Sequence, residues 1–145
     1  MTRAALALAV LVGGCTACMD AINTPALQRR AEALTQGTPV QVESCGMFSG
    51  TRKGACRLVG QRVELAALAD RVGLREVAVE PAYGRTSCLT WPAFGQARDR
   101  GFIGRTGVTL HRAPAPLAPG EGNVRLVAIY VTDTEACMEL EYPYG

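Results

Sequence analysis

A short apolar run at the N-terminus decides how much of this chain is left to fold. Ala4 to Val12 is nine residues long, and the charges before it are the amine of Met1 and Arg3. A membrane-spanning helix needs about 20 apolar residues, whereas the apolar region of an export signal needs roughly 7 to 15. We therefore expect residues 1–14 to be an export signal that takes no part in the fold. About 130 residues then remain, which is enough for one ordinary domain.

The run closes with Val12-Gly13-Gly14-Cys15, which resembles the lipobox of bacterial lipoproteins. In that class the signal is cut just before the cysteine, whose thiol carries a diacylglycerol group. The resemblance covers about residues 1–15 and identifies no family for the domain behind them. Cys18, preceded by Cys15-Thr16-Ala17, is the alternative acceptor, and ordinary cleavage or an uncleaved anchor is a further alternative. A redox C-x-x-C motif normally follows a strand rather than a signal-like run, and this disfavours such a role for Cys15 and Cys18.

The same resemblance implies a location and a domain division. We expect a lipid-anchored protein of the bacterial cell envelope with its domain outside the cytoplasm. Thr16 follows Cys15 where an Asp would favour the inner membrane, so the outer membrane is favoured. Residues 15–23 would be a lipidated tether, and residues 24–145 a single domain.

Four further cysteines are expected to form disulfides, because exported chains fold in an oxidising compartment. Cys45 lies in one β-like run and Cys56 in the next, around a Gly-containing connection. Reflecting Cys45 through that turn reaches Cys56, so of the three pairings we predict Cys45–Cys56 together with Cys88–Cys137. A zinc site would need short C-x-x-C spacings, which the domain lacks. Acylation of Cys15 would leave Cys18 as the odd cysteine.

Apolar spacing predicts two amphipathic helices. The first begins with Thr24 as N-cap and Pro25 as the first helical residue, and it ends before Gly37. The second covers Val63–Val72 and ends at Gly73. Their apolar faces are Leu27, Ala31 and Leu34 in the first helix and Leu65, Leu68 and Val72 in the second.

Alternating or β-branched runs predict the strands. They cover residues 40–45, 55–59, 76–80, 87–91, 108–112, 124–132 and 138–142. Residues 92–100 are expected to form a helical turn, and the Pro- and Gly-rich residues 113–123 an exposed loop. Together these elements predict an α+β fold in which two helices pack on a mainly antiparallel sheet of five or six strands, held by disulfides.

Catalytic patterns are scarce in this sequence. His111 is the only histidine, and its alternating strand is expected to point it away from the core, with Arg112 lowering its pKa. Neither G-x-S-x-G nor H-E-x-x-H occurs. Glu139 and Glu141 alternate as on a solvated strand face. We therefore expect no enzyme, metal or cofactor, and a small hydrolase that uses His111 is the second alternative.

Charge is unevenly distributed although the mature chain is nearly neutral, with 14 basic and 13 acidic residues once Arg3 is removed. This balance gives no nucleic-acid footprint. Residues 98–112 hold four arginines and one acid, whereas the chain from Glu121 onward holds five acids and one base. The two regions either neutralise each other or leave the arginine-rich loop free as a partner surface. That candidate surface is Trp91, Arg98, Arg100, Phe102, Arg105 and Arg112.

These features favour a membrane-anchored, non-enzymatic accessory, scaffold or assembly component of an envelope complex. Its partners would be the membrane, through the lipid, and other envelope proteins. The alternative is an exported binding or inhibitor protein that uses the loop 98–112.

Overall fold

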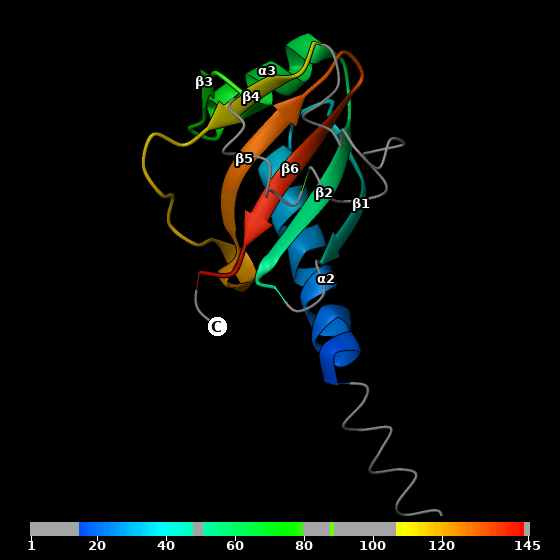
Figure 1. The fold of residues 1–145 in the computed structure, drawn as a ribbon. Helices are drawn as coiled ribbons and strands as arrows, with labels where there is room; N and C mark the ends of the chain where they lie inside the picture. Colours follow the sequence, from blue (N-terminus) through cyan, green and yellow to red (C-terminus); the bar gives the residue numbers. More distant parts are fainter. Residues whose placement is uncertain (1–14, 48–50, 80–87, 89–106, 144–145) are drawn as a thin grey trace, which may run out of the picture.

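Two helices lie on one face of a six-stranded antiparallel sheet in a computed structural model (Figure 1). The structure describes residues 15–47, 51–79, 88 and 107–143, and the side chains of the first helix from Asn23 onward. In chain order the elements are α2 (Cys15–Thr35), β1 (Gln41–Met47), β2 (Lys53–Val59), α3 (Arg62–Arg71), β3 (Arg75–Val77), β4 (Thr109–Arg112), the 3-10 turn η2 (Glu121–Asn123), β5 (Arg125–Val131) and β6 (Glu135–Glu141). The predicted fold class is confirmed.

The strands are ordered β1-β2-β6-β5-β4-β3 across the sheet. The last two strands of the chain therefore occupy the centre, between the β1–β2 hairpin and the β3–β4 pair. This position explains why the run 124–132 is so rich in β-branched residues, because a central strand is buried on both faces. Residues 128–131 of β5 and 136–140 of β6 are all buried.

The predicted start of the first helix is wrong. Helix α2 begins at Cys15 and contains Pro25 in its interior, although Thr24 and Pro25 together form a local start signal. Pro25 removes one backbone donor, yet the helix continues on both sides of it. The predicted end is confirmed, because the Thr35 hydroxyl donates to the Ala31 carbonyl (2.9 Å) and Gly37 follows with φ +78°.

Helix α3 agrees with its prediction to within one residue at each end. Leu65 and Leu68 point into the core, together with Ala69. Gly73, with φ +89°, allows the chain to turn away from the helix toward β3.

The face of the sheet beneath α2 and α3, here called the helix face, carries the main hydrophobic core. Cys56, Leu58, Leu126, Ile129, Val131, Ala136, Met138 and Leu140 contribute to it from the strands, and Leu27, Ala31, Leu65 and Leu68 from the helices. Gly54 marks the closest approach, because a Cβ there would lie 2.3 Å from Leu27 Cδ1. The helix can therefore settle on β2 only where a strand position has no side chain.

The opposite face of the sheet, here called the second face, is also buried at its centre. Its core consists of Ala55, Cys88, Leu110, Ala128, Tyr130 and Cys137. Glu139, directly opposite Ala55 and Ala128, is only 3% exposed. The prediction of a solvated face for Glu139 and Glu141 is wrong, because this face is covered and Glu141 is half-buried in an ion pair.

The remaining predictions fall into two groups. Strands β1 to β6 overlap six of the seven predicted runs, although β3 shares only residues 76–77 with its run and β6 begins three residues earlier than predicted. Residues 113–120 form the expected loop before η2. The predicted strand 87–91 is wrong at Cys88, its one described residue, because Cys88 is helical. The rest of that run and the turn over 92–100 lie outside the described residues.

Candidate functional site

Helix α2 extends beyond the sheet at its N-terminal end (Figure 1). Cys15 is its first residue and Cys18 follows three residues later. Nearer the sheet, the Tyr142 hydroxyl donates to the Asn23 carbonyl (2.9 Å) and ties the helix to the end of the chain. The eight helical steps from Cys15 to Asn23 cover about 12 Å along the helix axis. Both candidate acceptors for the lipid therefore lie beyond the point at which α2 meets the domain.

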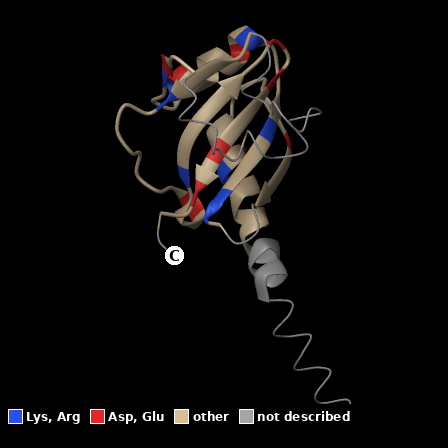
Figure 2. Cartoon of the chain, in the orientation of Figure 1, with Lys and Arg blue, Asp and Glu red and all other residues tan. Residues whose placement is uncertain are grey.

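The end of the domain from which α2 emerges, here called the base, is rich in basic side chains. The backbone N–H of Tyr142 donates to the Arg52 carbonyl (2.9 Å), and Lys53 lies opposite Glu141 in the β2–β6 ladder. Figure 2 shows basic colour at the start of β2 and acidic colour at the end of β6. The charged side chains of the base are Arg29, Arg30, Arg52, Lys53, Glu121, Arg125 and Glu141, a net charge of +3.

Two of these basic side chains have fixed neighbours. Arg125 binds Glu141 through two of its nitrogens, at 3.0 and 2.6 Å. The Arg30 guanidinium packs so closely against Gly120 that a Cβ there would lie 2.1 Å from it. In the described part of the chain, Arg29, Arg52 and Lys53 form no ion pair.

Tyr142 links α2 to this end of the sheet, and its surroundings shift the pKa of its phenol. Burial raises the pKa of the phenol, and the nearby Arg29 opposes that rise. Side chains on a helix lean toward its N-terminus, so Arg29 is directed toward the base. Arg52 and Lys53 are not among the predicted site residues, because only the register of β2 brings them beside the emerging helix.

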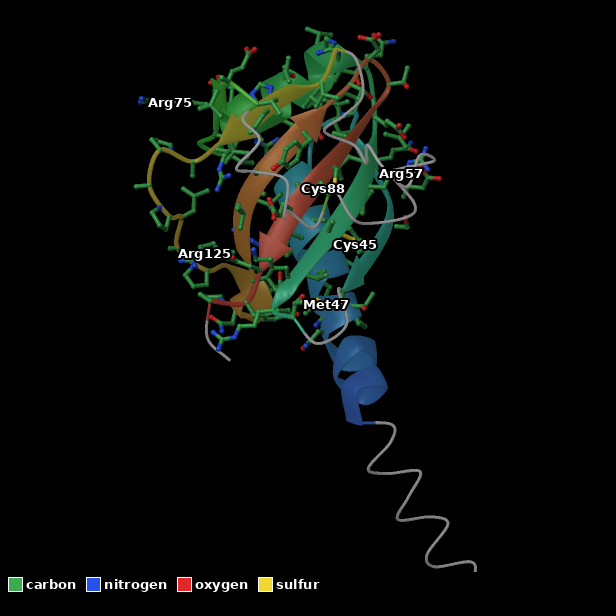
Figure 3. The ribbon with its side chains drawn as sticks, viewed as in Figure 1. Cys45, Met47, Arg57, Arg75, Cys88 and Arg125 are labelled. Atoms are coloured by element: carbon green, nitrogen blue, oxygen red, sulfur yellow. A yellow bond between two sulfur atoms is a disulfide. The ribbon has the colours of Figure 1, made fainter. Side chains whose placement is uncertain are left out.

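The two predicted disulfides are present, one on each face of the sheet (Figure 3). Cys45 and Cys56 are directly opposed in the β1–β2 hairpin, with Cα atoms 4.0 Å apart. Cys88 is bound to Cys137 in β6, with a Cα separation of 5.8 Å. The first disulfide closes a hairpin beneath α2, and the second fastens a residue from a distant segment to the middle of the second face.

His111 does not point away from the core as predicted. It is 7% exposed and lies opposite Ile129, which places it on the helix face near α3. Burial lowers its pKa; Arg62 adds to this effect, whereas Glu76 and Asp70 oppose it. The expected direction is therefore correct, but burial and not Arg112 is the main cause. Nε2 of the ring lies 3.3 Å from the Thr109 hydroxyl.

The predicted partner surface is described only at Arg112. This residue ends β4 and lies opposite Arg75 in the edge strand. The other members, Trp91, Arg98, Arg100, Phe102 and Arg105, lie outside the described residues.

A hollow of about 330 Å³ lies between the α2–β1 connection and α3. Pro39, Val63, Ala67 and Leu68 form most of its wall, with Glu64 and Arg71 also lining it. Val63 is 72% exposed, and the apolar wall suits a hydrophobic side chain better than a polar ligand. The hollow is at the opposite end of the molecule from Cys15.

Two further features concern metals and membranes. No cluster of three metal-ligating side chains occurs within the ranges that the structure describes. Among those same residues, no helix is both long and apolar enough to cross a membrane. Comparison of the chain with protein-family models, with curated proteins and with solved structures found no match.

Proposed function

We propose that this chain is an exported bacterial lipoprotein, acylated at Cys15, whose domain is a non-enzymatic accessory or scaffold component of an envelope complex. The observation that carries the proposal is the sequence Val12-Gly13-Gly14-Cys15 at the end of a short apolar run. The further proposal that the anchor lies in the outer membrane depends on Thr16, which follows Cys15.

The position of Cys15 supports this proposal. A lipid acceptor must reach the membrane without unfolding the domain, and Cys15 lies about 12 Å beyond the Tyr142–Asn23 contact. The two disulfides support export, because structural disulfides persist in oxidising compartments. The burial of His111 disfavours the hydrolase alternative, since a catalytic base has to reach its substrate.

Mass spectrometry of the protein extracted from membranes, before and after reduction, tests the proposal directly. We expect a mature chain that begins at acylated Cys15 and contains two disulfides. Cys15→Ala should abolish acylation, whereas the matched variant Cys18→Ala should leave it unchanged. An unmodified Met1 would overturn export, and acylation that survives in Cys15→Ala would move the anchor to Cys18.

The accessory role requires a separate measurement. The tagged wild-type chain, solubilised from membranes, should retain envelope proteins in stoichiometric amounts. Recovery of the chain alone under mild detergent would contradict a scaffold role while leaving the lipid anchor intact.

A further inference from the structure

We infer that the base of the domain is a docking surface for anionic lipid headgroups, formed chiefly by Arg29, Arg52 and Lys53. This inference rests on the proposed lipid anchor, and it adds that the anchored domain is oriented on the membrane. The bilayer surface is the partner for which the charge and the position of the base are suited.

The first step is the position of the basic side chains. The Tyr142 backbone N–H and hydroxyl bind the Arg52 carbonyl and the Asn23 carbonyl, so the start of β2 and the emerging helix meet at one residue. Lys53 follows Arg52, and Arg29 is close enough to influence the Tyr142 phenol. Arg52 and Lys53 thus lie near the point at which the chain leaves for its anchor, and Arg29 lies about 9 Å further along α2.

The second step is that these charges are available. The three side chains are exposed, and none of them is engaged in an ion pair within the described residues. The acidic groups at this end do not cancel them. Glu141 is paired with Arg125, and Glu121 is a single exposed carboxylate.

The third step is a contrast with the opposite end. We call α3 and the β5–β6 turn the apex; its charged residues are Arg62, Glu64, Asp70, Arg71 and Asp133, with a net charge of −1. Arg62 and Asp133 neutralise each other there at 2.8 Å. Among the described residues, α3 and the β5–β6 turn therefore lack the excess of positive charge found at the end that a lipid on Cys15 would hold near the membrane.

Distance makes the interaction feasible once the helix tilts. An upright α2 would hold the Tyr142–Asn23 contact about 12 Å from Cys15, beyond the physiological Debye length of about 8 Å. Tilting of α2 brings the base closer to the charged headgroups, where screening by salt is weaker. Each basic residue near an anionic surface shifts the equilibrium between the upright and the tilted domain about fivefold. The orientation of the domain should therefore depend on lipid charge and on salt.

The test uses the acylated full chain, labelled with a donor dye whose emission does not depend on its environment. The dye is attached to an encoded residue that replaces Gln61 or, in a second preparation, Thr51. The chain is reconstituted into vesicles of phosphatidylcholine alone or with about 30% phosphatidylglycerol, with an acceptor dye on a headgroup. Energy transfer from Thr51, at the base, should rise with phosphatidylglycerol and return to its starting value in about 0.5 M salt. Transfer from Gln61, beside α3, should not rise.

The deciding variant is Arg52→Gln with Lys53→Gln, and its matched control is Arg71→Gln with Arg75→Gln, which removes two exposed charges elsewhere. In the base variant, the equilibrium constant for tilting onto phosphatidylglycerol-containing vesicles should fall about 25-fold. The control variant should show the same rise in energy transfer as the wild-type chain. Circular dichroism should show that both variants fold. A lipid response that persists in the base variant, or is absent from the wild-type chain, overturns the inference.

Flotation separates this inference from the anchor. Wild-type chain that floats with phosphatidylcholine vesicles retains its lipid, whatever the response to charge. Chain that floats only with phosphatidylglycerol, and only while Arg52 and Lys53 are present, refutes the anchor but supports the basic surface. Chain that floats with neither overturns both.

Discussion

The helix face and the second face of the sheet are closed by different means. Two helices cover the helix face, and its core is aliphatic side chains contributed by both layers. Helices α2 and α3 do not cover the second face, where a buried carboxylate and a phenol lie among Leu110 and small residues. Cys88, a helical residue, is fastened to the centre of this face by a disulfide. Among the described residues, the helix face therefore has the larger aliphatic core, whereas the second face has a smaller buried cluster with a disulfide at its centre. Four experiments test this contrast.

The largest effect should come from removing the link on the second face. Cys88→Ala with Cys137→Ala opens a loop of 49 residues, and the chain-entropy estimate predicts a loss of about 4 kcal/mol in the free energy of unfolding. Urea denaturation in non-reducing buffer measures it. A loss below about 1 kcal/mol would mean that the second face is held by other contacts.

Removing the disulfide of the helix face should cost less. Cys45→Ala with Cys56→Ala opens a loop of only 11 residues, for which the same estimate gives about 3 kcal/mol. The hairpin also remains held by its ladder and by α2. The two double variants should be compared in one urea series, and a larger loss here than for Cys88 and Cys137 would reverse the contrast.

Tight packing on the helix face should make Gly54→Ala destabilising by about 2 kcal/mol. The new methyl group would meet Leu27 Cδ1 at 2.3 Å and the Gly46 carbonyl oxygen at 2.8 Å, so α2 or the hairpin must shift. The matched control is Gly60→Ala, whose Cβ would lie no closer than 3.4 Å to Val40. Thermal unfolding should show a lower Tm for Gly54→Ala and an unchanged Tm for Gly60→Ala. Equal shifts in both variants would indicate a general cost of replacing glycine.

The smallest effect should be a pH dependence from His111, which lies under α3 on the same face. Because burial lowers its pKa in the folded state, the unfolded chain binds more protons once the pH falls below the ordinary value of about 6.5. Stability should therefore be full above that value and decline as the pH falls through it. His111→Gln should flatten this part of the profile, measured by urea unfolding between about pH 7 and pH 5. A profile that does not change would remove His111 as the cause.

Local patterns in the sequence predicted the elements that these experiments use. Helix α3 and the strands follow from spacing and turn residues, and Cys45–Cys56 follows from reflection through a single hairpin. Cys88–Cys137 then followed by elimination, although its two residues are 49 positions apart.

The errors arose where a property depends on distant parts of the chain. The burial of Glu139 and the orientation of His111 are set by strand register and by what covers each face, neither of which alternation reveals. The prediction of where α2 starts failed for a different reason. The Thr24-Pro25 pattern is equally compatible with a proline inside a longer helix. The basic surface at Arg52 and Lys53 was not predicted, because these residues come to lie beside α2 only through the register of β2 with β6.

The order of the disulfides along the chain has a consequence for biogenesis. Each joins a cysteine to the next one in sequence beyond Cys18, so the two loops neither overlap nor enclose each other. A polypeptide that emerges from a translocon N-terminus first can form both by joining each arriving thiol to the one before it. Such a chain should mature with an oxidase alone, without an isomerase to rearrange mispaired bonds, provided that Cys18 is kept out of the sequence of pairing.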